Sequence, residues 1–253
     1  MGSVTNPKLF CYTTTMNKYI NLKIGIVPII AAVIVFFPSC SGRINAELAQ
    51  NGSGTVRLEA GLEPNMTALI RSFVSMGSGE SGPLLDAVSL NRSLSAAHGI
   101  SSSSLRNTGQ EKVEGTIGIR NIGDLLNTGA NRFVQYTTAS SGNKLAISLD
   151  RTIAPQILIQ IYPEAVDYLS ALMAPAATGE ALSKAEYLTL VESVYGKPLT
   201  AEISSSRVNA VIILPGTVTS VKGGTSSGRE ARFDIPLIDL LVLEQPLYYE
   251  INW

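Results

Sequence analysis

The sequence predicts an α+β fold: an antiparallel sheet, built from hairpins and a C-terminal meander, with three or four amphipathic helices packed on it. Three observations support this prediction. Alternating apolar and polar residues flank an Asn-Gly step near residue 51, helix patterns with end signals occupy the middle of the chain, and alternation returns toward the C-terminus. Hydrophobic residues make up 45% of the chain, so burial alone can stabilise a domain of this size.

The first predicted element is a hairpin around residues 51–54, which read Asn-Gly-Ser-Gly. An Asn-Gly step between two period-2 runs supplies the positive φ angles that a tight turn needs. Arg57 and Glu59 are expected to face solvent on the second strand. The opposite, apolar side of both strands is expected to face the core and consists of Ile44, Ala46, Leu48, Val56, Leu58, Ala60 and Leu62.

Pro64 begins a predicted helix, and Gly77 is placed to end it. The helix has one apolar stripe, made of Met66, Leu69, Ile70, Phe73 and Val74. A weaker helical stretch follows from Pro83 to about Ala97.

The clearest helix pattern lies between Ser183 and Gly196. Ser183 and Glu186 form a capping box, and Gly196 and Pro198 end the helix. Its predicted apolar face consists of Tyr187, Leu188, Val191, Val194 and Tyr195.

The other segments predict mainly strands. Residues 116–120 alternate, and residues 133–138 are expected to face an alternating strand at 145–149 across a turn at 140–143. Residues 156–162 suit either a buried strand or a helix, residues 163–173 are predicted helical, and residues 175–179 form a loop. From Ala201 onward the pattern predicts an antiparallel meander, with turns at 214–216 and 223–228.

The N-terminal region predicts export. Lys18 and Lys23 precede an uncharged apolar run, residues 24–37, which is too short for a comfortable membrane span. A small residue then stands directly before Cys40, and together these features resemble a bacterial lipoprotein signal that is cut before an acylated cysteine. Phe37 and Pro38 depart from the usual residues of such a signal, and an uncleaved anchor or an ordinary secretory signal are the alternatives.

These features divide the chain into three parts. Because a signal of ordinary length begins at Met16, residues 1–15 are interpreted as a misassigned start or a disordered extension, residues 16–39 as the signal peptide, and residues 40–253 as the exported domain, lipidated at Cys40. With Cys11 before the signal and Cys40 acylated, the domain is predicted to have no disulfide and no cysteine metal site.

The charge of the exported domain excludes one class of partner. All 20 acidic residues lie beyond Cys40, whereas three lysines precede it, so the domain is mildly acidic. Binding to nucleic acid needs clustered lysine and arginine and is not expected. The same balance argues against general attraction to anionic lipid headgroups, so the acyl chains are expected to hold the membrane unaided.

Three short motifs match enzyme signatures in their residue types but lie in the wrong predicted structural context. Residues 77–82 match the G-x-G-x-x-G of dinucleotide sites but follow a predicted helix, where that loop requires a preceding strand. Residues 224–228 match the G-x-S-x-G nucleophile elbow but lead into a strand, with no histidine after them, and are interpreted as a hairpin turn. Ser141 and Lys144 match Ser-x-x-Lys but lie in a predicted tight turn.

The remaining chemical candidates are few. His98 is the only histidine and is interpreted as a residue at the end of a helix. No acidic cluster with calcium-loop spacing is present in the sequence. The sequence therefore predicts no metal site, no cofactor and no enzyme activity. The C-terminal aromatic residues Tyr248, Tyr249 and Trp253 suit an apolar ligand pocket, the membrane interface or the core, with Tyr249 and Trp253 the candidate pocket residues.

The two ends of the exported domain resemble LppM-type bacterial lipoproteins. The resemblance rests on residues 44–48 (Ile-Asn-Ala-Glu-Leu) soon after the cysteine, on residues 55–59 (Thr-Val-Arg-Leu-Glu), and on the style of the segments 208–214, 217–222 and 232–243. It implies an α+β domain with an apolar cavity that handles lipid or glycolipid at the cell envelope. Those proteins tend to carry a C-terminal transmembrane helix, which this chain does not show before Trp253.

Two functions follow as hypotheses. The first is a membrane-anchored envelope lipoprotein whose sheet and helices enclose a lipid-like ligand. The second is a structural or interaction lipoprotein that contacts another envelope component, with residues 77–82 and the serine-rich residues 101–104 as candidate contact loops. The sequence identifies neither the ligand nor a protein partner.

Overall fold

A computed structural model describes residues 41–77, 82–126, 133–140, 142–156 and 169–253. The signal peptide, Cys40, most of the glycine-rich connector at 77–82, Ser141 and much of the two segments 156–162 and 163–173 lie outside these ranges. The described residues have an α+β architecture with two largely antiparallel sheets, which confirms the predicted fold class.

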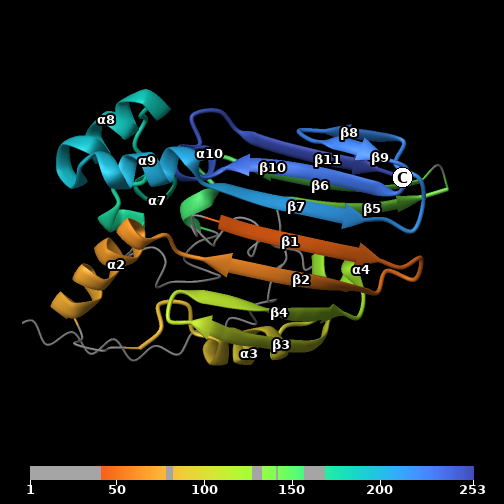
Figure 1. Cartoon of the computed structure of the whole chain (residues 1–253). Helices are drawn as coiled ribbons and strands as arrows, with labels where there is room; N and C mark the ends of the chain where they lie inside the picture. Colours follow the sequence, from red (N-terminus) through yellow and green to blue (C-terminus); the bar gives the residue numbers. More distant parts are fainter. Residues whose placement is uncertain (1–40, 78–81, 127–132, 141, 157–168) are drawn as a thin grey trace, which may run out of the picture.

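Seven strands form the larger sheet: β1 (Ser41–Leu48), β2 (Gly54–Gly61), β3 (Ile100–Gly109), β4 (Lys112–Ile119), β7 (Arg207–Ile213), β9 (Thr225–Ser227) and β10 (Glu230–Pro236). Their order is β3-β4-β2-β1-β7-β10-β9 (Figure 1). The predicted first hairpin is present as β1 and β2, with Ala46 opposite Val56 and Ile44 opposite Leu58. All of the predicted inward residues of this hairpin are buried.

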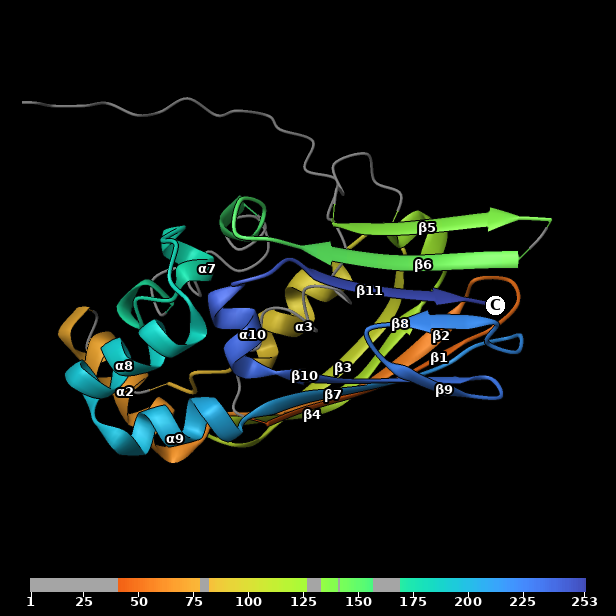
Figure 2. The same cartoon turned by 90° about the horizontal axis from the view of Figure 1, so that it is seen from above.

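The smaller sheet contains β5 (Val134–Ala139), β6 (Gly142–Leu149), β8 (Ser220–Lys222) and β11 (Leu247–Asn252), in the order β5-β6-β11-β8. The predicted hairpin before residue 149 is present, because Val134 lies opposite Ile147 and Tyr136 opposite Leu145. Figure 2 shows this sheet as a separate layer over one face of the larger sheet.

Seven described helices complete the fold: α2 (Pro64–Gly77), α3 (Ala87–Ser95), α4 (Ile122–Leu126), α7 (Pro175–Thr178), α8 (Lys184–Tyr195), α9 (Lys197–Ser205) and α10 (Leu237–Val242). Helices α2, α8 and α9 gather at the end of the larger sheet where β1 begins (Figure 1). Helix α3 and the smaller sheet lie on the same side of the larger sheet (Figure 2). No described element covers the opposite face (Figure 2), on which Arg43, Arg57 and Glu59 are exposed.

Several predictions were wrong in detail. The region after Ala201 is not a simple meander, because α9 extends to Ser205 and α10 interrupts the strands. Strand β7 pairs with β1 in parallel, and β8 and β11 belong to the second sheet. The predicted loop at residues 175–179 begins with the short helix α7. The serine-rich residues 101–104 form part of the edge strand β3 instead of a loop.

Helix α8 has the predicted capping box. The Ser183 hydroxyl accepts a hydrogen bond from the Glu186 backbone amide at 3.2 Å, and the Glu186 carboxylate accepts one from the Ser183 amide at 2.8 Å. Tyr187 and Val191 are buried as predicted, but Val194 is 54% exposed. Val194 therefore lies outside the apolar face to which the sequence pattern assigned it.

Replacing Ser183 with alanine is expected to lower the free energy of unfolding by about 1 kcal/mol, because the first amides of α8 lose their acceptor. Urea denaturation of residues 41–253 measures the change. Ser193→Ala is the matched control, since its hydroxyl contacts only the Leu190 carbonyl on the exposed side of the same helix. An equal loss in both variants would contradict a role for the capping box.

Candidate functional site

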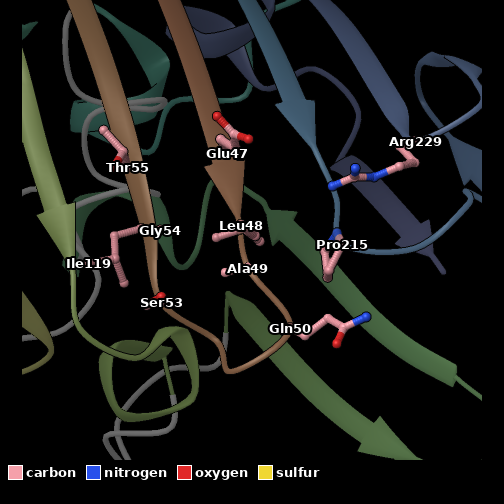
Figure 3. A pocket seen from close by; sticks show the side chains of 10 residues that line it. All are labelled: Glu47, Leu48, Ala49, Gln50, Ser53, Gly54, Thr55, Ile119, Pro215 and Arg229. Carbon is pink, nitrogen blue, oxygen red and sulfur yellow. The ribbon is translucent and has the colours of Figure 1, made fainter.

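A hollow lies at the end of the β1–β2 hairpin and is here called the distal hollow (Figure 3). It has a volume of about 550 Å³, and it is lined by Glu47, Leu48, Ala49, Gln50, Ser53, Gly54, Thr55, Ile119, Pro215 and Arg229. Figure 3 shows that these residues come from the hairpin, from the end of β4, and from the segments after β7 and before β10.

Local hydrogen bonds hold the hairpin beside this hollow in one shape. The Ala49 amide donates to the Ser53 carbonyl at 2.8 Å, and the Asn51 side chain accepts from the Ser53 amide at 3.0 Å. Gly52 has a φ of +78°, which favours glycine, and its carbonyl accepts from the Ile122 amide at the start of α4 at 2.7 Å. The tip of the hairpin is therefore attached to α4 as well as closed on itself.

The distal hollow has the chemistry of a recognition surface. Its two charged residues, Glu47 and Arg229, are both exposed, and Leu48, Ile119 and Pro215 supply apolar surface. The Arg229 Nε donates to the Leu214 carbonyl at 2.6 Å, which fixes one side of the guanidinium and leaves its other donors available.

A second, much smaller space lies between the two sheets and is here called the inter-sheet gap. Its volume is about 20 Å³, room for about one water molecule. All of its lining side chains are apolar or aromatic: Leu145, Ile147, Ala210, Ile212, Phe233, Ile235, Tyr249 and Ile251. A cavity of this character is expected to stay dry.

The structure separates the two predicted pocket residues. Tyr249 lines the inter-sheet gap and meets Phe233 edge to face, with ring centroids 5.5 Å apart. Burial raises the pKa of the Tyr249 hydroxyl to about 12. Trp253 is not among the residues that line the gap. It is 8% exposed and stacks on Tyr136 with centroids 6.1 Å apart.

A charged cluster surrounds Glu250 on the other side of β11. Glu250 is 5% exposed, and its carboxylate lies 2.7 Å from the Lys144 Nζ and 3.3 Å from the Lys222 Nζ. The Tyr248 hydroxyl and the Asn252 amide also donate to it. The Lys144 hydrogen bond, followed by those from Tyr248 and Asn252, holds the pKa of Glu250 far below its ordinary value of 4.5. The Glu250 hydrogen bond also raises the pKa of Lys144.

Replacing Glu250 with glutamine is expected to change how stability depends on pH. Because the folded pKa lies below the unfolded one, the unfolded state binds more protons in acid. The stabilisation by Glu250 is therefore complete above about pH 4.5 and is lost as the pH falls toward the folded pKa. The difference in free energy of unfolding between wild type and Glu250→Gln should be constant from pH 7 to about 5 and should shrink below that.

Urea denaturation at a series of pH values measures this difference. Glu180→Gln is the control, since Glu180 is exposed and has no ion pair among the described residues. A difference that stays constant down to pH 3 would contradict the assignment to Glu250.

The other sequence candidates do not come together. His98 is exposed in the turn that follows α3. Residues 224–228 were predicted to be a hairpin turn, but residues 225–227 form the short strand β9, which pairs with β10 and leaves the turn to the residues that follow it. Within the described ranges there is no group of three or more histidine, cysteine, aspartate and glutamate residues that could hold a metal ion. No helix there is long and apolar enough to cross a membrane.

The distal hollow was not predicted from the sequence. The alternation of apolar and polar residues along β1 places Glu47 on the outer face of the sheet, so the sequence could have identified Glu47 as an exposed residue at the end of this strand. Nothing local indicates that Pro215 and Arg229 lie beside it, because the parallel pairing of β1 with β7 brings them there.

No protein-family model and no curated protein matches the chain. Among solved structures, the NMR structure of the folded domain of LppM from Mycobacterium tuberculosis is similar to it. The two are 10% identical, the match covers 84% of this chain and 87% of that one, and the TM-score is 0.34.

Proposed function

We propose that the chain is an envelope lipoprotein, held to a membrane by acyl chains on Cys40, and that its domain contacts another envelope component through the distal hollow. One observation carries the proposal: β1 begins at the residue after Cys40 and ends at the hollow. The strand has eight residues, so the hollow lies about 25 Å from the anchor. A membrane-bound domain would present it away from the bilayer.

The size and chemistry of the hollow support this role. Its volume of about 550 Å³ is in the range of about 300–1,000 Å³ that is typical of binding sites. Its mixture of polar, charged and apolar lining residues suits a loop of another protein. Because the hairpin is held by hydrogen bonds at both its base and its tip, binding would require little ordering of this surface.

The anchor is tested first, in cells that express the full chain. Metabolic labelling with an alkyne fatty acid should mark the wild type and not Cys40→Ser, and the unlabelled variant should leave the membrane fraction. Labelling of both forms, or of neither, would contradict acylation at Cys40.

The contact surface is tested by photo-crosslinking in the same cells. A photoreactive amino acid at Gln50, in the distal hollow, should give a discrete crosslinked product. The control position is Val194, which is exposed on α8 near the opposite end of the molecule. The absence of a product at Gln50, or the same product from both positions, would contradict the proposal.

A second candidate function is the binding of a lipid-like ligand between the two sheets. It is favoured by the fully apolar lining of the inter-sheet gap, to which four strands contribute. A gap of about 20 Å³ does not hold an acyl chain, so this function requires the two sheets to move apart on binding.

Native mass spectrometry of residues 41–253, followed by solvent extraction, tests this candidate. A bound lipid in the wild type should disappear in Ala210→Leu, which fills the gap, and persist in Ala185→Leu on the exposed side of α8. A wild type without added mass in the presence of envelope lipids would exclude it.

A further inference from the structure

We propose that Lys112 and Arg207 form a second binding site, beside the anchor, for the phosphate groups of lipid headgroups in the bilayer that holds Cys40. The site rests on the proposed anchoring at Cys40. It lies on the uncovered face of the larger sheet, at the end where β1 begins, and occupies a hollow of about 340 Å³.

The strand register places both cations next to the anchor. Lys112 lies opposite Gly61, Gly61 opposite Ser41, and Ser41 opposite Arg207. These four residues form one row across β4, β2, β1 and β7, here called the anchor row. Strands are about 4.8 Å apart, so the backbone of Arg207 is about 5 Å and that of Lys112 about 10 Å from Ser41. Cys40 is bonded to Ser41, with their Cα atoms about 3.8 Å apart.

The two side chains are placed to reach a headgroup. A Cβ atom on Gly61 would lie 3.1 Å from Lys112 Cγ and 3.6 Å from its Cε, so the lysine side chain lies across Gly61. Arg207 Nη1 donates to the carbonyls of Ser204 and Ser206, both at 2.9 Å, at the end of α9. An arginine carries five N–H donors, and those not bonded to these carbonyls remain available for phosphate.

The acidic residues of this hollow are already neutralised. Glu59 pairs with Arg43 at 3.2 Å, and Glu114 pairs with Arg106. Among the described residues, Lys112 and Arg207 have no acidic partner. The hollow therefore carries two uncompensated positive charges, although the exported domain as a whole is acidic. This local excess differs from the sequence-based expectation that the acyl chains alone would hold the membrane.

The geometry of the anchor favours a bilayer as the source of the phosphate. A chain acylated at Cys40 has no linker between the lipid and β1, since β1 begins at Ser41 and is paired on both sides there. The anchor row is thereby brought to the membrane surface. Each lysine or arginine near an anionic surface strengthens attachment by about five-fold.

A singly acylated protein measures this contribution directly. In residues 40–253, Cys40 is the only cysteine, and its thiol is coupled to one maleimide-linked acyl chain. One chain gives only marginal, reversible membrane binding, so an added headgroup contact changes the measured partition. Sedimentation with phosphatidylcholine vesicles, with and without phosphatidylglycerol, gives the ratio of partition coefficients.

Lys112→Gln is expected to lower this ratio by about five-fold, and Arg207→Gln by a similar factor. The control is Arg57→Gln, which removes an equal charge from the same face at a position four residues from Gly61 along β2. A wild-type ratio equal to that of Lys112→Gln, or an equal drop in Lys112→Gln and Arg57→Gln, would overturn the proposal.

The result does not depend on lipidation in cells, because the acyl chain is attached chemically. A failure of fatty-acid labelling at Cys40 would therefore overturn the anchor, whereas an unchanged ratio would overturn only the headgroup site. Lys112 is exposed, and its variant is expected to unfold at the wild-type urea concentration, which confirms that the comparison is between folded proteins.

Discussion

Tyr187→Ala is expected to lower the free energy of unfolding by about 4 kcal/mol. The side chain of Tyr187 is fully buried beneath α8, and removing its ring would leave a cavity that the surrounding helices fill only in part. Its hydroxyl donates to the Leu172 carbonyl at 3.1 Å, and the neighbouring Tyr195 hydroxyl donates to the Ala171 carbonyl at 2.5 Å. The two tyrosines thus attach α8 to the segment before α7.

Two further variants distinguish the contribution of the Tyr187 ring to stability from that of its hydroxyl, and both from the effect of a substitution on the helix surface. Tyr187→Phe keeps the ring and leaves the Leu172 carbonyl without this donor, so a loss of about 1–2 kcal/mol is expected. Val194→Ala on the exposed side of α8 should change stability by less than about 0.5 kcal/mol. Equilibrium urea denaturation gives all three values. A loss below about 2 kcal/mol for Tyr187→Ala would show that the helices close over the cavity.

Gly115→Ala is expected to destabilise the domain by about 2–4 kcal/mol. Gly115 has a φ of +155°, and a Cβ atom there would lie 2.0 Å from the Ser104 carbonyl oxygen and 2.7 Å from Leu105 Cα. Both atoms belong to the backbone of β3, so no rotamer change relieves the clash. Strand β3 cannot simply move away, because the Asn91 side chain of α3 accepts from the Leu105 amide at 2.8 Å and donates to its carbonyl at 2.7 Å.

The matched control is Gly109→Ala in the same β3–β4 hairpin. Nothing lies within 4 Å of a Cβ atom at that position, so the change in stability should be within about 0.5 kcal/mol of zero. Thermal and urea denaturation distinguish the two variants. Similar stabilities would mean that β3 is held less firmly than its contacts with α3 indicate.

The sequence predicted correctly those parts of the fold that depend on residues close together in the chain. The Asn-Gly turn, the capping box at Ser183 and the alternation around Val56 each depend on residues that are close in sequence. Strand β3 was missed because its serine run has no apolar alternation. Strand β3 lies at the edge of the sheet and has a neighbouring strand on one side only. On its other side the Asn91 side chain forms hydrogen bonds with the Leu105 backbone, as a second neighbouring strand would.

The errors after residue 196 have a different cause. Gly196 ends α8, but Gly196 and Pro198 also begin α9. These two residues were interpreted from the sequence only as the end of a helix, and the helix that follows was therefore missed. The parallel pairing of β1 with β7 joins residues far apart in sequence, and no local pattern encodes it. The same pairing assembles both the distal hollow and the anchor row, so neither site was visible in the sequence.

The position of β1 also determines how the domain would respond to mechanical force. The strand is hydrogen-bonded to β2 on one side and to β7 on the other over almost its whole length, starting at Ser41. Tension transmitted through a lipid on Cys40 enters along the strand axis, roughly perpendicular to these bonds. The force would therefore act in shear on all the hydrogen bonds between β1 and its two neighbouring strands at once, instead of breaking them one after another. Force applied through the membrane anchor would thus act along the direction in which the sheet is most resistant to mechanical unfolding.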